Sequence, residues 1–558
     1  MASIVYTTAR YAIPFHAWDD PRVKSILKQD VSGWRVRRGL LRAAAALPAP
    51  PARAIVALAV DEWSSHTKAY ASLAGRWWVN GQLETRTIVF QQLRAKRRGD
   101  GRFVTDAANV ADVLRRAIGH LKLEIASVTA DGAGLPTARL LSDVTLHCTA
   151  HRLQLAVRSI LKSLVPATLE RLCKLIRIIR FPRGAAALRK AFKESKHLAD
   201  DDAAEELVMP SGCITRWGSF LASFEFLNTH YEIIRAAMLD VANHQLSKVP
   251  VRFDDVEVMN IQLLLPFLRR LERTTAALGG SAVTAGDAAY LVLKLTHGVG
   301  ESVTITSGSD VGDDENHHDE DELRDKLEEA YASRGEETDG EPELDDEARL
   351  TEERLLAVSG ETAHGRDRGL TVQSITHAFD TALIRYRIAP LELDEALAGL
   401  LHPSYAFVFE EHLESKYGKS AETLLLGLKP DDVEEPASSA AGASAAVATA
   451  EGTQFDDLLR TSQRRRVLCP VRRYLGGGAT ETADPIGWWD QRRSEYSWLA
   501  QVAITRLIRL PTSTACERSF SQGRRQSTHL RGRLNAHSLA ALVRVGEACV
   551  DPDFMPTP

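Results

Sequence analysis

The chain has 558 residues with a formal net charge of −5, and its six cysteines are scattered without a CxxC pair. This length exceeds what one hydrophobic core usually organises, so we expect two or three domains. No apolar run approaches the roughly 18 residues that a membrane-spanning helix needs, and the cysteine pattern excludes a disulfide framework. These features predict a soluble intracellular protein with reduced thiols and no membrane partner.

The small net charge hides two segments of opposite character. Residues 310–347 hold 19 acidic residues against 3 basic ones, whereas residues 456–550 hold 16 arginines, no lysine and 8 acids. The first segment is too acidic and too poor in apolar residues to fold, which predicts a disordered loop over residues 308–346. That loop either competes for the arginines or only solubilises the chain. The second segment is either a phosphate-binding surface or a solvated arginine surface.

The N-terminal third shows an alternation of strand and helix patterns. After a helical segment over residues 1–52, the apolar run AIVALAV at residues 54–60 is typical of a buried central strand that ends at Asp61. The elements expected next are strands at 70–79 and 83–93, a helix at 105–121, a strand that ends at Asp131, a helix, a short strand at 147–149 and a helix at 151–164. This is the order of a ribonuclease H-like α/β sheet, in which the first and fourth strands are adjacent. Ligands bind beyond the carboxyl ends of such strands, so we expect Asp61 and Asp131 to lie close together.

The middle of the chain is expected to be helical. From about residue 181 to residue 402 apolar residues recur at helical spacing, with few strand signals. We therefore divide the chain into an α/β core over residues 53–180, a helical insertion over 181–453 and a helical C-terminal region over 454–550. The insertion contains the acidic loop and an Ala/Ser linker at 437–450.

One long helix is expected near residues 489–510. Six apolar residues share a helical face there, namely Trp489, Tyr496, Leu499, Ala503, Leu507 and Leu510. This face must pack against either the core or a second subunit.

Glu517 has two interpretations. It follows Thr514 by three residues, which is the spacing of a helix capping box. It is also a lone acid before an arginine-rich run, which suits a metal ligand. Local spacing cannot separate the two.

Several motifs resemble the hAT superfamily of cut-and-paste DNA transposases. They are DEWS at residues 61–64, VTADG at 128–132, the CxxH of 148–151, TRWGS at 215–219, LHPSYAF at 401–407 and CERSFS at 516–521. The resemblance implies a ribonuclease H-like core, interrupted by a large all-helical insertion and completed by a helical C-terminal dimerisation region. It further implies self-association, a DNA partner and a nuclear location. The BED zinc finger that normally precedes this core is not visible in the sequence.

The resemblance also implies roles for particular residues. Asp61, Asp131 and Glu517 correspond to catalytic carboxylates, which would bind Mg²⁺ or Mn²⁺ and cleave and transfer DNA strands. The residues expected to contact DNA are Arg216, Trp217, Arg518, Arg524, Arg525 and Arg531. Trp217 would stack on a base near the cleavage point, or else pack in the insertion core. Cys148 and His151 are expected to shape the core near the site, and zinc is not expected because no second ligand pair is visible.

A second interpretation is a domesticated, catalytically inactive protein that dimerises and associates with DNA. Gly132 and Gly134 stand where the family usually has asparagine, which keeps this alternative open.

Overall fold

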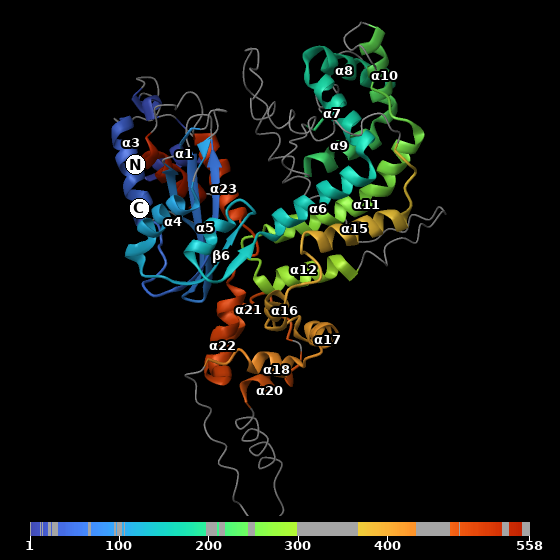
Figure 1. Cartoon of the computed structure of the whole chain (residues 1–558). Coiled ribbons are helices and arrows are strands. Elements are labelled where there is room, and N and C mark those ends of the chain that lie inside the picture. Colours follow the sequence, from blue (N-terminus) through green and yellow to red (C-terminus); the bar gives the residue numbers. More distant parts are fainter. Residues whose placement is uncertain are drawn as a thin grey trace, which may run out of the picture. The chain divides into compact units, whose positions relative to one another are not determined.

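The computed structural model describes residues 2–11, 13, 15–19, 24, 32–64, 69–93, 96–97, 103–104, 106–196, 209–210, 218–243, 251–297, 367–430, 469–478, 480–526 and 535–548. Two compact units divide the chain. The first comprises residues 1–156, 271–296 and 383–558, and the second comprises 157–270 and 297–382. Figure 1 shows a sheet with helices in the first unit and helices alone in the second. Within the part of the chain that the structure describes, every helix is too short or too polar to cross a bilayer.

A mixed five-stranded sheet organises the first unit, in the order β3-β2-β1-β6-β7. The strands are β1 (Ile55–Ser64), β2 (Ala69–Val79), β3 (Gln82–Leu93), β6 (Glu124–Ala130) and β7 (Thr145–His147). The first three strands are antiparallel neighbours, whereas β6 runs parallel to β1 and β7 parallel to β6. The predicted central position of the first strand is therefore confirmed, as is its pairing with the fourth strand of the sheet. Two short strands, β4 (Lys96–Arg97) and β5 (Phe103–Val104), pair separately.

Local sequence explains the β2–β3 hairpin. Its two-residue turn is Asn80-Gly81, and both residues have positive φ, 51° and 78°. Asn-Gly is the favoured pair for such a turn because its twist matches that of the flanking strands. Further along, a Cβ atom at Gly75 would lie 2.2 Å from Cδ1 of Ile88, so a larger residue there would require the Ile88 side chain to move.

The two faces of the sheet pack against different helices. These helices are α4 (Ala107–Ile118), α5 (Leu135–Leu141), α23 (Thr514–Gln526) and α24 (Ala536–Ala548). The face that carries Leu58 and Val60 packs with α4 and α5, whereas the face that carries Ala59 packs with α23 and α24. Successive strand residues point to opposite faces, so the continuous apolar run of β1 reflects burial on both sides. The last helices of the chain thus form one of the two helical layers that flank the sheet (Figure 1).

The N-terminal segment packs outside this layer. It forms α1 (Ala2–Arg10), η1 (Phe15–Asp19) and α3 (Gly33–Ala46). Their apolar side chains, including Val36 and Leu40, share a buried cluster with Leu542 and Val545 of α24. The helical N-terminal segment that the sequence predicts is confirmed over these residues.

The remaining helices of the first unit lie between residues 285 and 507 of the sequence. They are α12 (Ala285–His297), α16 (Leu393–Leu400), α17 (Ala406–Tyr417), α18 (Ala421–Leu426), α20 (Pro470–Leu475), α21 (Pro485–Gln491) and α22 (Arg493–Leu507). The single helix expected over residues 489–510 is wrong, because α21 ends at Gln491 and the backbone leaves helical geometry again at Ser497 (φ 42°, ψ −119°). All six apolar residues of the expected face are nevertheless buried. Trp489 donates from its indole nitrogen to the carbonyl of Leu401 (2.8 Å), so this face packs within the unit.

The second unit is helical, as the sequence predicts. It contains α7 (Pro166–Arg180), α8 (Pro182–Lys196), α9 (Gly218–Thr229) and α10 (Tyr231–Asn243). The division between the units also falls within α6 (Thr149–Leu164), α11 (Asp255–Leu278) and α15 (Val372–Arg385), and at the last residue of α12. The carboxylate of Asp367 accepts hydrogen bonds from the first turn of α7, including the backbone N–H of Thr168 (2.8 Å). The acidic loop at 308–346 and the linker at 437–450 lie outside the described residues.

Candidate active site

Strand register places the two predicted aspartates together. The parallel pairing of β1 with β6 ends at Val60 opposite Ala130, so the next residues of the two strands are Asp61 and Asp131. The expectation that the first strand ends at Asp61 is wrong, because β1 continues to Ser64. Those last residues pair only with β2. Asp61 therefore lies where the two parallel strands separate.

Short hydrogen bonds orient both carboxylates. The Oδ1 atom of Asp61 accepts from the backbone N–H of Glu62, and that of Asp131 accepts from the backbone N–H of Gly134, both at 2.7 Å. A Cβ atom at Gly134 would lie 3.1 Å from Cβ of Ala130 and 3.2 Å from Oδ1 of Asp131. The glycine thus lets the loop return to the carboxylate, and its main chain supplies the hydrogen bond.

The segment before α23 is fixed to the same edge of the sheet. The backbone N–H of Thr149 donates to the carbonyl of Pro511 (3.0 Å), and the hydroxyl of Thr129 donates to the carbonyl of Leu510. The backbone N–H of Ser513 lies 3.3 Å from Sγ of the buried Cys148. This cysteine of the CxxH motif therefore contacts the segment that leads to Glu517.

A second cysteine brings Glu517 to the aspartates. The Sγ atom of buried Cys516 donates to the carbonyl of Ala59 (3.2 Å), two residues before Asp61. Glu517 follows in the first turn of α23 with an exposed side chain. The structure thus brings the start of α23, which carries Glu517, to the strand that carries Asp61.

The pKa of Asp61 reflects its burial and the neighbouring carboxylates. The pKa of Asp61 is raised from 3.8 to about 8, first by burial, then by the negative charge of Asp131, and further by those of Glu517 and Glu62. Among the described residues, no lysine or arginine forms an ion pair with Asp61, Asp131 or Glu517. Within the described ranges, these carboxylates therefore have no basic ion-pair partner.

The capping-box interpretation of Glu517 is not realised. A capping box would need Thr514 just before the helix, but α23 begins at Thr514, so this threonine is its first helical residue. The carbonyl of Ser513 accepts from the backbone N–H groups of Cys516 and Glu517 (2.9 and 3.3 Å). Within the described ranges, the carboxylate of Glu517 makes no hydrogen bond to the start of its own helix. It remains available on the surface beside the aspartates.

Two residues of the site were missed by sequence reasoning. Glu62 adds a fourth negative charge and lies 3.4 Å from the hydroxyl of Thr137; the acidic pair at 61–62 was the signal for it. His147 ends β7, and its buried Nε2 has no hydrogen-bonding partner among the described residues. A Cβ atom at Gly132 would lie 3.8 Å from that nitrogen, so a polar side chain at position 132 could reach it. The ring of His151 lies 6.2 Å from that of His147.

Three of the six predicted DNA-contacting residues can be placed. Arg518 donates to the carbonyl of Gly279 (3.0 Å), so its guanidinium is held against the main chain. Arg524 and Arg525 are exposed in the last turn of α23. Arg216, Trp217 and Arg531 lie outside the described residues.

The chemical type of the donors, rather than their spacing, suits Mg²⁺ or Mn²⁺. Hard carboxylate oxygens suit such ions, and Mg²⁺ commonly takes only one or two carboxylates together with water and substrate phosphates. In the described part of the chain, no three His, Cys, Asp or Glu side chains are grouped so that they could hold a metal ion.

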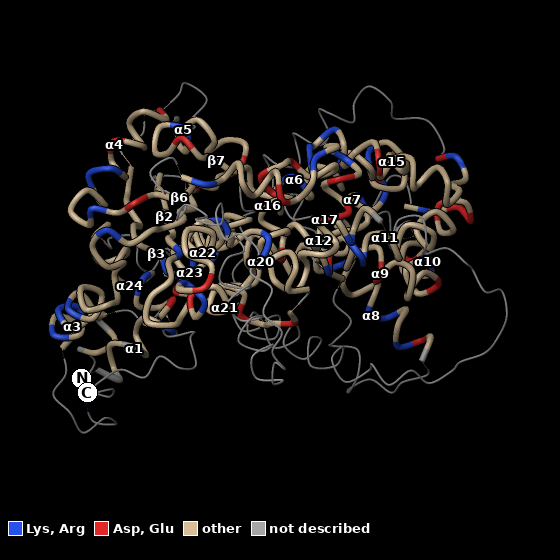
Figure 2. Tube along the Cα trace, turned by 90° about the horizontal axis from the view of Figure 1, so that it is seen from below, with Lys and Arg blue, Asp and Glu red and all other residues tan. Residues whose placement is uncertain are grey.

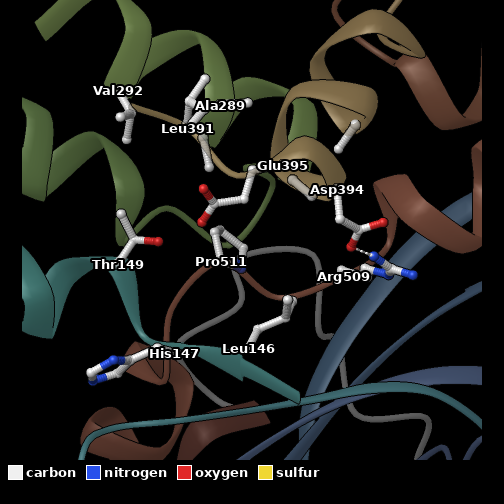
Figure 3. A pocket seen from close by; sticks show the side chains of 13 residues that line it. Leu146, His147, Thr149, Ala289, Val292, Leu391, Asp394, Glu395, Arg509 and Pro511 are labelled. Carbon is white, nitrogen blue, oxygen red and sulfur yellow. Dashed lines mark hydrogen bonds and ion pairs between the residues drawn. The ribbon is translucent and has the colours of Figure 1, made fainter. Parts of the chain in front are cut away.

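A separate pocket of about 40 Å³ lies nearby, between β7, α12, α16 and residues 509–511 (Figure 3). Its charged groups are already paired: Arg509 with Asp394, and Glu395 with Arg152 at 2.6 Å. None of the three candidate carboxylates lines it. We assign this pocket to packing between these elements.

The substitution Asp61→Asn is expected to stabilise the protein in metal-free buffer. An acid whose pKa is raised on folding contributes most stability below its unfolded pKa and loses it as pH rises towards the folded pKa, here from about 4 to about 8. Asparagine carries no such penalty, so the variant should melt several degrees above wild type at pH 8, with about 2 to 4 °C for each kcal/mol. The difference should vanish near pH 4. Thermal denaturation in EDTA across this pH range measures it, and an equal difference at both pH values would contradict the charge argument.

Comparison with known families adds to this geometry. Residues 470–547 match the hAT family C-terminal dimerisation region. The chain therefore contains a hAT C-terminal dimerisation region. No curated protein matches the chain. The matched hAT region begins at α20 and ends in α24, so it contains Glu517 and both helices that cover one face of the sheet. It also supports self-association, as predicted for residues 454–550.

Proposed function

We propose that this protein is a hAT-type transposase that cleaves DNA and transfers DNA strands in a reaction that depends on Mg²⁺ or Mn²⁺. The observation that supports the proposal is that Asp61, Asp131 and the start of α23 with Glu517 lie at one end of the sheet, where burial and then the charges of Asp131 and Glu517 raise the pKa of Asp61 to about 8. The strand order, with helices on both faces, supports a ribonuclease H-like core.

Each carboxylate has a distinct place in this proposal. Asp61 and Asp131 would hold the metal from the ends of adjacent parallel strands, and the exposed Glu517 would complete the site from α23. A bound metal supplies activation of the attacking oxygen and stabilisation of the leaving oxygen. The Gly134 N–H keeps the carboxylate of Asp131 oriented. The hydrogen bond from Cys516 to Ala59 keeps the first turn of α23 beside β1.

The test is nicking of supercoiled plasmid DNA by the purified full-length protein. Conversion to the open circle is expected with Mg²⁺ or Mn²⁺ and not with EDTA. Activity that persists in EDTA would contradict the metal-dependent mechanism.

A non-catalytic, dimerising role on DNA is the second candidate function. It is favoured by Gly132 and Gly134, which supply no side chains beside Asp131, and by the unpartnered Nε2 of His147 that faces position 132. In that case the protein would bind DNA and self-associate without nicking it. A nuclear location is part of both proposals.

Removal of the acidic residues 310–347 is expected to tighten DNA binding. This segment carries 19 acids against 3 basic residues, so it competes with phosphates for the arginines of the C-terminal region. Affinity for duplex DNA should rise several-fold at low salt, and the gain should shrink as salt screens the competition. Fluorescence anisotropy across a salt series measures both. Replacement of the segment by a neutral linker of equal length is the control for chain length, and it should behave like the deletion.

A further inference from the structure

The outer face of α3 is strongly basic. In this 14-residue helix Val36, Leu40 and Ala44 are buried, and they face the apolar cluster around α24. The opposite side exposes Trp34, 64% accessible, and the arginines 35, 38 and 42. The helix contains four arginines and no acid. Figure 2 shows basic residues gathered on α3.

This surface is presented on a fixed support. The hydroxyl oxygen of Ser32 caps the helix by accepting from the backbone N–H of Arg35 (3.3 Å). Arg37 donates from Nε to the hydroxyl of Ser538 at the start of α24 (2.8 Å). The guanidinium of Arg38 lies 5.3 Å from the centre of the Trp34 ring. Such cation–π contacts contribute about 0.5 to 1 kcal/mol at exposed sites, and this one orders Arg38.

Helix stability does not account for this charge. Arg38 and Arg42 are four residues apart, and like charges at this spacing destabilise a helix by about 0.2 to 0.5 kcal/mol. A cation in the first turn, such as Arg35, also opposes the helix dipole. In the described ranges no acidic residue forms an ion pair with Arg38 or Arg42. The pattern therefore fits a surface that is neutralised by a polyanion.

We propose that the outer face of α3 is a DNA-contact surface, in which Arg38 and Arg42 bind backbone phosphates and Trp34 holds Arg38 in place. Arginines along one helix face suit the phosphates of a duplex, which are sequence-independent partners. The apolar face of α3 is already buried against α24, so the helix has no free apolar side to insert into a lipid surface. The inference rests on the proposed function only for its identification of DNA as the polyanion.

The double substitution Arg38→Gln, Arg42→Gln tests this surface in the full-length protein. Each lost phosphate contact lowers the slope of log affinity against log salt by about 0.9, so the slope should fall by about 2. Affinity for a 30-base-pair duplex should fall on the order of tenfold at 0.1 M salt. Anisotropy of a labelled duplex in EDTA gives both values without any catalysis.

A matched control removes the same charge elsewhere. Arg116 pairs with Asp112 (2.8 Å) and Arg269 with Glu225 (2.7 Å), so Arg116→Gln, Arg269→Gln lowers the net charge equally but leaves α3 intact. This control should bind within about twofold of wild type. Equal losses for the two double variants would overturn the proposal, because the effect would then be one of net charge. Loss of binding to phosphatidylserine vesicles with unchanged DNA binding would also overturn it.

The two proposals fail separately. An Asp131→Asn protein that binds DNA normally but does not nick leaves the α3 surface intact. A protein that binds through α3 and never nicks plasmid refutes only the catalytic proposal. Wild-type affinity in the α3 variant, with nicking retained, refutes only the surface.

Discussion

Replacement of Asp131 by asparagine is expected to reduce Mg²⁺-dependent nicking by roughly a thousandfold or more. The change removes one negative charge from the site but keeps a side chain of the same shape, which can still accept from the Gly134 N–H. Metal-based charge stabilisation contributes several kcal/mol, and about 1.4 kcal/mol corresponds to a tenfold change in rate. Glu517→Gln should act in the same direction. Plasmid nicking by single-turnover kinetics measures both.

The control for this experiment is Asp143→Asn. Asp143 is an exposed acid between α5 and β7, so it shares the same part of the chain without belonging to the carboxylate group. It should nick DNA at the wild-type rate. If Glu517→Gln retained full nicking while Asp131→Asn lost it, the active site would consist of the two aspartates without α23.

Phe520→Ala is expected to destabilise the protein by about 3 kcal/mol or more, the usual effect of removing a buried aromatic ring. Phe520 is 8% exposed and lies one turn after Glu517. Its ring lies 6.0 Å from that of Trp63 and 5.9 Å from that of Phe90, so it holds α23 against β1 and β3. Urea denaturation measures the loss.

The matched control lies on the same helix. Arg525 is exposed, and its replacement by alanine should change stability by no more than about 0.5 kcal/mol. Nicking should fall in Phe520→Ala even under conditions where the protein stays folded, because Glu517 then loses its support. Unchanged stability in Phe520→Ala would mean that α23 is held to the sheet by other contacts.

The sheet and its two aspartates were predictable because they depend on local pattern. A run buried on both faces is continuously apolar, so the first part of β1 is visible in the sequence, and Asp61 and Asp131 follow the last residues that β1 and β6 pair. The continuation of β1 past Asp61 was not predictable in this way. Residues 62–64 are extended and pair with β2 alone. They therefore lack the continuous apolar pattern that marks the earlier part of the strand.

The interruption of helices and the packing between distant segments were not predictable. The six apolar residues between Trp489 and Leu510 do match a helical period, but the positive φ of Ser497 depends on tertiary packing and leaves no local signal. An apolar face shows that a helix is buried and does not show what covers it. The packing of α3 on α24 and the approach of α23 to β1 therefore emerge only in three dimensions. The effect of the Glu62 charge on the pKa of Asp61 likewise depends on the folded structure.

The covering of one sheet face by α23 and α24 also sets an order of events during synthesis. The hydrogen bond from Cys516 to Ala59 joins residues that are 457 positions apart. At roughly 5 to 20 residues per second, the ribosome needs on the order of 20 to 90 s to reach α23 after it has made β1. Throughout that interval α23 and α24 do not yet cover Tyr70 and Phe90, so the nascent chain exposes an apolar sheet face to solvent. Chaperone binding to the growing polypeptide is therefore expected to concentrate on the β1–β3 meander until translation reaches the end of α24.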